Sequence, residues 1–287
     1  MKTNVTNARI GELPNYLLIG ATKGGTTSLH AYLSSHPDIF MHPVKELRYF
    51  SAEHNWARGE AWYWEQFADV HAAKAIGEAS NSYARFPIYG GVPERIANIK
   101  PDMRFVYAIR HPLERIESHY RHRIVTGVEW RSASAALAED PSYLAVSRYA
   151  YQLEQYLQHF PREQILVVRS EQLKADPEVT LRRIYEFLGV DANAATERLT
   201  LNVSAERRSA PAWLREFSRF PALRPHVKRL AFRLRRSPLG RFSALADALP
   251  FAPCGRPFDE LIAVLKDDLH SLGELLQEDF SDWDLDG

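Results

Sequence analysis

The segment covering residues 16–29, YLLIGATKGGTTSL, constrains the fold of this chain more than any other stretch. Its apolar start, residues 16–19, predicts a β-strand, a glycine-containing loop follows, and Thr26 and Thr27 open a helix. Unpaired backbone N–H groups and the positive end of the helix dipole converge at such a helix start, and glycines let an anion approach closely. The segment therefore predicts a phosphate-binding loop. The alternative is a glycine turn that only closes a strand–helix unit.

This loop only partly matches the Walker A loop of nucleotide hydrolases, G-x-x-x-x-G-K-[ST]. Gly20, Gly25 and Thr27 fit the pattern, but Thr26 stands where those proteins keep a lysine on the β- and γ-phosphates. Lys23 lies inside the loop, from where it would reach the phosphate from the other side. We therefore expect a phosphate loop that does not serve a nucleoside triphosphate with magnesium. Its predicted phosphate contacts are Lys23, Gly24, Gly25, Thr26 and Thr27.

Length and composition indicate a single globular domain. We expect one domain over residues 1–287, with a polar tail at residues 1–13 and a basic helical insertion at residues 212–257. The 36 Lys and Arg residues balance 36 Asp and Glu residues, so the net charge does not point to a nucleic-acid partner. The one cysteine, Cys254, excludes an internal disulfide and fits a reducing compartment. With no signal-peptide core and no membrane-spanning run in the sequence, we expect a cytoplasmic protein.

Short apolar runs alternate with helical patterns along most of the chain. The expected strands are residues 16–19, 39–41, 75–77, 104–109 and 165–168, and the main expected helices are residues 26–34, 93–99, 112–126, 149–160, 177–188 and 258–280. Strands that alternate with helices predict a parallel sheet covered on both faces. The expected fold class is therefore α/β, a P-loop-like three-layer fold with a mostly parallel central sheet flanked by helices and a helical C-terminal third.

Arg110 and Ser118 form a candidate second anion site. Arg110 directly follows the strand expected at residues 104–109, at the edge where doubly wound folds bind ligands. Ser118 lies about two turns into the next helix, so an arginine fork and a hydroxyl can share one phosphate. The alternative is a surface arginine and an unrelated helical serine.

A basic stretch at residues 219–241 carries an apolar stripe at helical spacing. Such a helix either packs its stripe on the core and leaves one basic face in solvent, or lies on an anionic membrane surface. The second arrangement would give the protein a peripheral membrane contact.

Several segments, taken in order, resemble the motifs of the sulfotransferases that use 3′-phosphoadenosine 5′-phosphosulfate (PAPS). The segments are GATKGGTTSL, KELRYF, GEASNSY, AIRHPLERIESHY, FPREQILVVRSEQLKADPEVTLRRIYEFLGV and LLQEDFSDW. They are most similar to the type shared by bacterial enzymes and the heparan sulfate N- and 3-O-sulfotransferases. The resemblance extends over residues 13–283, and its specificity comes from the order and spacing of the motifs together.

The resemblance implies a role for each candidate anion site. The first loop would hold the 5′-phosphosulfate, with Lys23 near the bridging oxygen, which gains negative charge as the S–O bond breaks. Arg110 and Ser118 would hold the 3′-phosphate. A later basic loop in the family closes over that phosphate, and Arg207 and Arg208 stand at the comparable place. The product would be adenosine 3′,5′-bisphosphate.

The resemblance also implies that Glu46 is the general base. A carboxylate within hydrogen-bond reach of an acceptor hydroxyl or amine can take its proton as it attacks sulfur. The alternative is a solvated glutamate next to Lys45. His42 is a rival base, because histidine titrates near neutral pH. His42, Arg48 and Tyr49 are the candidate acceptor contacts.

The chain departs from the heparan sulfate enzymes in the segment GEASNSY. Some of those enzymes have a lysine where this chain has Ala79, so one cation of the sulfuryl site is missing and a polysaccharide acceptor is in doubt. Arg48 stands where the 3-O enzymes have histidine, and would supply part of the missing charge.

No metal is expected. The strand at residues 104–109 runs into Arg110 rather than a metal-binding aspartate, and no paired Cys/His spacing is present in the sequence. A sulfuryl group carries less negative charge than a phosphoryl group, so lysine, arginine and backbone N–H donors suffice to stabilise its transfer.

These observations predict in-line sulfuryl transfer from PAPS to a hydroxyl or amine of a carbohydrate, lipid or other small molecule. One alternative is a P-loop small-molecule kinase that uses ATP and magnesium. A third is a non-catalytic nucleotide-binding protein on a membrane surface. The sequence leaves the acceptor and the oligomeric state open.

Overall fold

The computed structural model of the chain describes residues 13–70, 72–194 and 251–285. Arg207, Arg208, the stretch 219–241 and most of the predicted insertion 212–257 therefore lie outside the described residues. Within the described ranges, no helix combines the length and the apolar character that crossing a bilayer requires.

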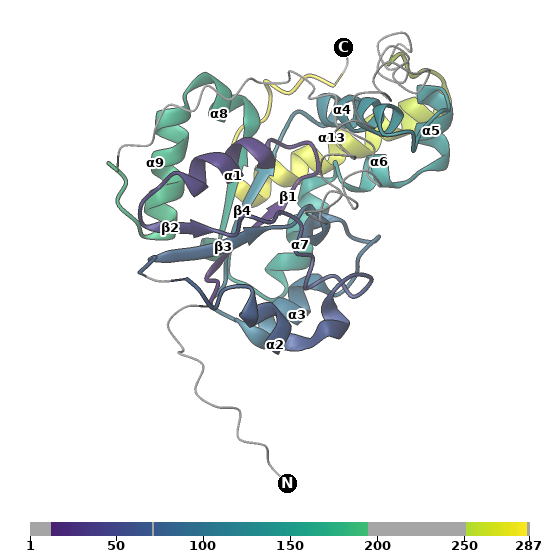
Figure 1. Cartoon of the computed structure of the whole chain (residues 1–287). Helices are drawn as coiled ribbons and strands as arrows, with labels where there is room; N and C mark the ends of the chain where they lie inside the picture. Colours follow the sequence, from purple (N-terminus) through teal and green to yellow (C-terminus); the bar gives the residue numbers. More distant parts are fainter. Residues whose placement is uncertain (1–12, 71, 195–250, 286–287) are drawn as a thin grey trace, which may run out of the picture.

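A five-stranded parallel sheet forms the centre of the molecule (Figure 1). Its spatial order is β2 (Ile39–Met41), β3 (Ala75–Ala79), β1 (Tyr16–Gly20), β4 (Arg104–Ile109) and β5 (Ile165–Arg169). Because every neighbouring pair is parallel, the carboxyl ends of all five strands lie along one edge. That edge is where open α/β sheets bind ligands.

Helices connect the strands and cover both faces of the sheet. The α-helices are α1 (Thr26–Ser34), α2 (Gly59–Glu65), α3 (Val92–Ile99), α4 (Pro112–Val125), α5 (Ala133–Glu139), α6 (Ser142–Ala145), α7 (Tyr149–Leu157), α8 (Ser170–Ala175), α9 (Pro177–Leu188) and α13 (Arg256–Leu276). Short 3₁₀ turns are η1 (Trp56–Arg58), η2 (Asn81–Ala84) and η3 (Arg162–Gln164). The expected α/β fold with helices on both sides of a parallel sheet is confirmed.

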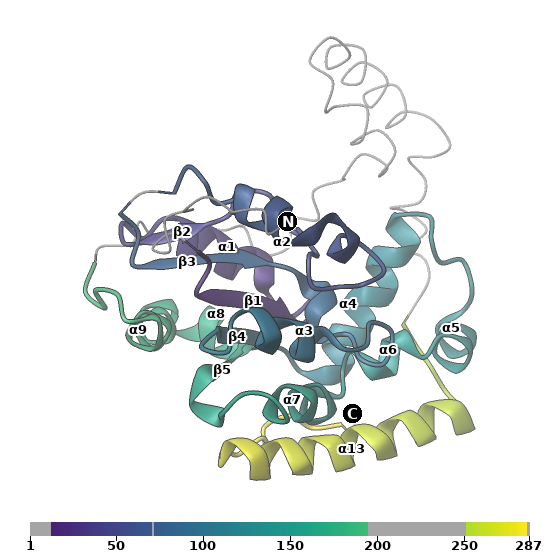
Figure 2. The same cartoon turned by 90° about the horizontal axis from the view of Figure 1, so that it is seen from below.

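Alternate residues of each strand face opposite layers. In β1, Leu17 and Ile19 join a core with side chains of α3, α4, α7 and α13, whereas Tyr16 and Leu18 pack with α1 and α9. Successive side chains of a strand point to opposite faces of the sheet. Because layers cover both faces here, the sequence of the strand is a continuous apolar run. Figure 2 shows α7 and α13 side by side on one side of the sheet.

The predicted strands and long helices are present, and most differences lie at their ends. The last helix ends at Leu276 rather than at residue 280, because Gln277 adopts a left-handed backbone (φ 55°) and Glu278 N donates to Gly273 O at 3.2 Å. The chain then returns along the carboxyl edge of the sheet, where the His111 ring contacts the Asp284 carbonyl at 2.8 Å. The short helices α5, α6 and α8 were not predicted, because four to seven residues hold too little periodicity.

The C-terminal helix supplies a cap for another helix. Asp268 of α13 is buried, and its carboxylate accepts hydrogen bonds from Ala150 N and Tyr151 N, both at 3.1 Å, in the first turn of α7. The residue before α7, Arg148, makes no side-chain cap of its own. Asp268 therefore binds backbone N–H groups that the helix cannot satisfy internally, and burial raises its pKa to about 6.

Replacing Asp268 should weaken the docking of α13 on α7. Asp268→Ala leaves the buried Ala150 N–H and the part-buried Tyr151 N–H without their acceptor, so we expect the free energy of unfolding to fall by about 1–3 kcal/mol. Urea denaturation followed by circular dichroism measures this change. The exposed neighbour provides the control, since Asp267→Ala should stay within about 0.5 kcal/mol of wild type. Equal stabilities for the two variants would contradict the capping role.

Candidate active site

The predicted phosphate loop joins β1 to α1 and lies against the end of β4. Ala21 N donates to Ala108 O at 2.5 Å, and Gly24 N donates to Ala21 O at 2.9 Å. A Cβ on Gly24 would collide with Ala108 O, so no side chain fits there. Lys23 has a left-handed backbone (φ 70°). The backbone of the loop therefore sits directly on the carboxyl edge of the sheet.

The start of α1 has the properties of an anion site. Gly25 precedes the helix with φ 95° and offers no side chain to cap it. Thr26 is buried, whereas the hydroxyl of the exposed Thr27 accepts a hydrogen bond from Lys45 Nζ at 3.2 Å. N–H groups of the first turn without a side-chain cap, next to an ammonium group, favour a bound anion.

Arg110 directly follows β4 on the same edge. Its Nε and a terminal nitrogen donate to Glu114 Oε2 at 2.9 and 2.5 Å, and the Tyr149 hydroxyl donates to the Arg110 carbonyl at 2.6 Å. The Arg110 guanidinium holds the pKa of Glu114 below its usual range. Ser118 lies one turn beyond Glu114 on α4, so the guanidinium is oriented along the helix that carries the serine.

The two predicted anion sites thus lie on neighbouring strands. The loop contacts Ala108, which is two residues before Arg110. The strands β1 and β4 pair in parallel, with Gly20 opposite Tyr107. Both sites are therefore at the carboxyl ends of adjacent strands.

Glu46 lies in an irregular segment, residues 42–50, which follows β2 and crosses the end of β3. Glu46 N donates to Ala79 O at 2.7 Å. Its Oε1 accepts hydrogen bonds from Asn81 N at 3.2 Å and Asn81 Nδ2 at 2.8 Å, and Arg48 Nε lies 3.1 Å from its Oε2. These contacts orient the carboxylate with both of its oxygens engaged.

The backbone around Glu46 is strained. Glu46 and Arg48 both have positive φ, 64° and 53°, a region that residues other than glycine rarely adopt. Such conformations cost about 1–3 kcal/mol each and gather at functional sites. Arg48 N donates to Ser80 Oγ at 2.9 Å, which helps to hold this conformation.

A second glutamate, which the sequence interpretation did not single out, lies behind Glu46. Glu78 of β3 is fully buried and accepts hydrogen bonds from the Ser80 hydroxyl at 2.7 Å and the Tyr83 hydroxyl at 2.6 Å. Burial raises the pKa of Glu78 to about 7, although both hydrogen bonds act in the opposite direction. A carboxylate inside the otherwise apolar run AIGEA is the sequence signal that would have identified it. Glu78 accepts the hydrogen bond that orients the Ser80 hydroxyl, and this hydroxyl in turn accepts a hydrogen bond from Arg48 N in the segment 42–50.

The three residues predicted to contact the acceptor lie in different surroundings. His42 is buried, with its ring centroid 5.4 Å from Phe67, and its Nδ1 contacts the backbone of Val44. Tyr49 is only 1% exposed and stacks on Tyr63 at 4.4 Å. Both rings are core packing, and Arg48, whose side chain is 41% exposed, is the accessible member of the three.

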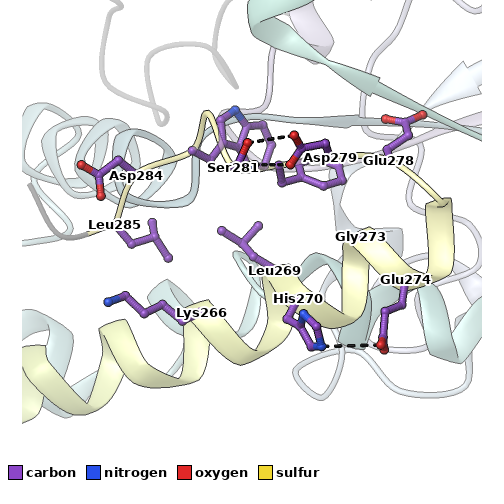
Figure 3. Close-up of a pocket in the computed structure, with 12 residues that line it drawn as sticks. Lys266, Leu269, His270, Gly273, Glu274, Glu278, Asp279, Ser281, Asp284 and Leu285 are labelled. Carbon is purple, nitrogen blue, oxygen red and sulfur yellow. Dashed lines mark hydrogen bonds and ion pairs between the residues drawn. The ribbon is translucent and has the colours of Figure 1, made fainter.

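A separate groove of about 610 Å³ lies between α13 and residues 278–285 (Figure 3). Its charged lining is mainly acidic, with Glu274, Glu278, Asp279 and Asp284 against Lys266 and His270. Such a lining repels a phosphate. Of the described residues that line it, none belongs to the phosphate loop or to residues 42–50, so this groove is not the predicted donor site.

Among the residues that the structure describes, no three or more His, Cys, Asp or Glu side chains gather as metal ligands would. Metal-independence remains a prediction.

The chain belongs to the sulfotransferase family, because residues 13–210 match the sulfotransferase domain. It is 30% identical over 188 residues to mouse heparan sulfate glucosamine 3-O-sulfotransferase 3B1, which covers 62% of this chain and 47% of that protein. It is 27% identical over 199 residues to bovine bifunctional heparan sulfate N-deacetylase/N-sulfotransferase 2, covering 62% of this chain and 22% of that protein. The chain spans about half the length of the curated relatives that it matches first.

A solved structure supports the same assignment. The crystal structure of a sulfotransferase from Alicyclobacillus acidocaldarius aligns with a TM-score of 0.66 and 27% sequence identity, over 94% of this chain and 98% of that one. The resemblance seen in the motifs is therefore confirmed for both sequence and fold.

Glu78 should make stability depend on pH. Folding raises the pKa of Glu78 from 4.5 to about 7. The contribution of the protonated carboxyl to the free energy of unfolding is therefore fully present below the pKa of the unfolded state. It is lost as the pH rises through the pKa of the folded state. Between about pH 5 and pH 8 the wild type should lose about 2.5 kcal/mol of unfolding free energy that Glu78→Gln does not lose.

Urea unfolding curves across this pH range measure the difference. Glu53→Gln, at an exposed position, serves as the control and should follow the wild type. If Glu78→Gln and wild type show parallel pH profiles, Glu78 does not titrate in this range.

Proposed function

We propose that the protein is a PAPS-dependent sulfotransferase that transfers a sulfuryl group in line to a hydroxyl or amine of a small-molecule, lipid or carbohydrate acceptor. One observation carries the proposal: the phosphate loop and the carboxylate of Glu46 lie at the ends of the adjacent strands β1 and β3, joined by the Lys45–Thr27 hydrogen bond. Family membership and the match to a bacterial sulfotransferase support it.

The residues present fit the two charged ends of the donor. The uncapped start of α1 and Lys23 would hold the 5′-phosphosulfate, and Arg110 with Ser118 would hold the 3′-phosphate. The carboxylate of Glu114 forms an ion pair with the guanidinium of Arg110. A bound phosphate would therefore share that guanidinium with Glu114. Arg207 and Arg208 are proposed to complete this second site.

PAPS supplies an activated sulfuryl group and a phosphate leaving group. Glu46 is proposed to take the proton of the acceptor as its oxygen or nitrogen attacks sulfur. Asn81 and Arg48 hold the Glu46 carboxylate in position for this. Lys23 and the N–H groups of α1 would stabilise the negative charge that develops on the leaving phosphate.

The kinase alternative is disfavoured by the loop itself. Thr26 is buried at the position where a kinase-type loop keeps its phosphate-binding lysine. The relatives are named for heparan sulfate, but Ala79 removes a cation that some of those enzymes have, so we leave the acceptor at the level of its hydroxyl or amine. Cytoplasmic location and membrane contact through residues 219–241 also remain predictions.

Nucleotide selectivity tests the donor assignment. We expect adenosine 3′,5′-bisphosphate to bind in isothermal titration calorimetry, and ATP with magnesium not to bind. Arg110→Ala should weaken the bisphosphate by about 10-fold to 100-fold, because a charge-assisted hydrogen bond contributes about 1.5–3 kcal/mol. Adenosine 5′-monophosphate, which lacks the 3′-phosphate, should bind the wild type and the Arg110→Ala variant with equal affinity. Arg104→Ala, at the opposite end of β4, is the matched control. Preference for ATP with magnesium would support the kinase instead.

Glu46→Gln tests the base. Losing general-base catalysis should lower kcat by about 10²-fold to 10⁴-fold and leave the affinity for adenosine 3′,5′-bisphosphate unchanged. Transfer from ³⁵S-labelled PAPS to 4-nitrophenol, a glucosamine oligosaccharide and a long-chain alcohol measures the rate. Glu53→Gln should retain wild-type activity. A Glu46→Gln enzyme as fast as wild type would remove Glu46 from the mechanism.

A further inference from the structure

Lys45 directs its ammonium group to the first turn of α1, although it comes from a different part of the chain. Lys45 Nζ donates to Thr27 Oγ1 at 3.2 Å. Thr27 occupies the hydroxyl position of the phosphate-loop pattern, and Thr26 fills the position where related nucleotide loops keep their lysine. An ammonium group from residues 42–50 therefore reaches the first turn of α1, where Thr26 stands in place of that lysine.

The surroundings of Lys45 differ from those of an ordinary surface lysine. Its side chain is half-buried, and burial lowers its pKa, while the charge of Glu46 acts in the opposite direction. Glu46 is the nearest carboxylate in sequence, but its two oxygens bind Asn81 and Arg48. Lys45 instead binds a neutral hydroxyl. A half-buried charge is costly unless an opposite charge accompanies it, so this position favours an anion.

We propose that Lys45 is a donor-binding residue that contacts the 5′-phosphate of PAPS together with Thr27. The inference rests on the proposed sulfotransferase function and adds a residue to its donor site. A phosphate that accepts the Thr27 hydroxyl would lie within reach of the Lys45 ammonium, because the two groups are already in hydrogen-bond contact.

The backbone next to Lys45 is anchored to the end of β3. Glu46 N donates to Ala79 O at 2.7 Å, so the segment that carries Lys45 passes directly over the end of β3. Because Lys45 and Glu46 are consecutive, the same anchored backbone positions a phosphate contact and the proposed base.

Lys45→Gln and Lys45→Arg test this assignment by calorimetry with two nucleotides. Adenosine 3′,5′-bisphosphate carries the 5′-phosphate, and adenosine 3′-monophosphate lacks it. We expect Lys45→Gln to weaken the bisphosphate by about 10-fold to 100-fold and to leave the 3′-monophosphate unchanged. Lys45→Arg keeps the charge and should restore most of the bisphosphate affinity. Thermal unfolding of each variant checks that the fold is intact.

The matched control is Lys74→Gln, because Lys74 pairs with Asp38 at 2.8 Å on the surface between β2 and β3. It should bind both nucleotides like wild type. If Lys45→Gln binds the bisphosphate as tightly as wild type, or loses both nucleotides equally, the assignment of Lys45 to the 5′-phosphate is overturned while the proposed function stands. Wild-type protein that binds neither nucleotide would refute the proposed function, and the role of Lys45 with it.

Discussion

The arrangement of the candidate active site depends on one close backbone contact, the approach of the phosphate loop to the end of β4. Gly24 lies so near Ala108 that even a methyl group would collide with the carbonyl oxygen, and Ala21 N bonds the same carbonyl. Since β1 and β4 are neighbours in a parallel sheet, this contact brings the start of α1 beside the residue that follows β4, Arg110. A larger residue at position 24 would lift the loop from the sheet and separate the two anion sites.

A second constraint holds the segment that carries Glu46. This segment has no regular secondary structure, and it is fixed instead by bonds to three consecutive residues at the end of β3, Ala79, Ser80 and Asn81. These bonds offset the strained backbone at Glu46 and Arg48. The adjacent side chains of Lys45 and Glu46 consequently form hydrogen bonds with different residues. Lys45 donates to Thr27 at the start of α1, and Glu46 accepts from Asn81. The proposed donor contact and the proposed base are therefore consecutive residues, Lys45 and Glu46.

Much of the fold was predictable, because it depends on local patterns. The apolar runs of β2 and β4 and the Pro-started helix α9 are found with the expected limits, since the pattern and its end signals lie within each segment. The glycine-loop pattern and the end of the strand at residues 104–109 predicted where Lys23 and Arg110 lie, whereas the role of Glu46 was implied only by motifs that resemble a family. The ligand contacts of these three residues stay predictions.

The remainder depends on tertiary contacts that no local pattern encodes. Tyr49 is an aromatic residue near the site in sequence, yet its ring stacks inside the core. Arg115 is fully buried, but its guanidinium binds Ser147 and the Tyr143 carbonyl, a structural role that its residue type does not reveal. The Lys45–Thr27 contact arises from the path of an irregular segment, which sequence periodicity does not describe.

The capping of α7 by Asp268 shows that the family match and the folding unit have different limits. The match ends at residue 210, whereas Leu265 and Leu272 of α13 are fully buried in the same core as Leu17 and Ile19 of β1. Tyr149, at the start of the capped helix, in turn holds the carbonyl of Arg110. A recombinant fragment trimmed to the homologous region would expose apolar surface and loosen the support of its own nucleotide site.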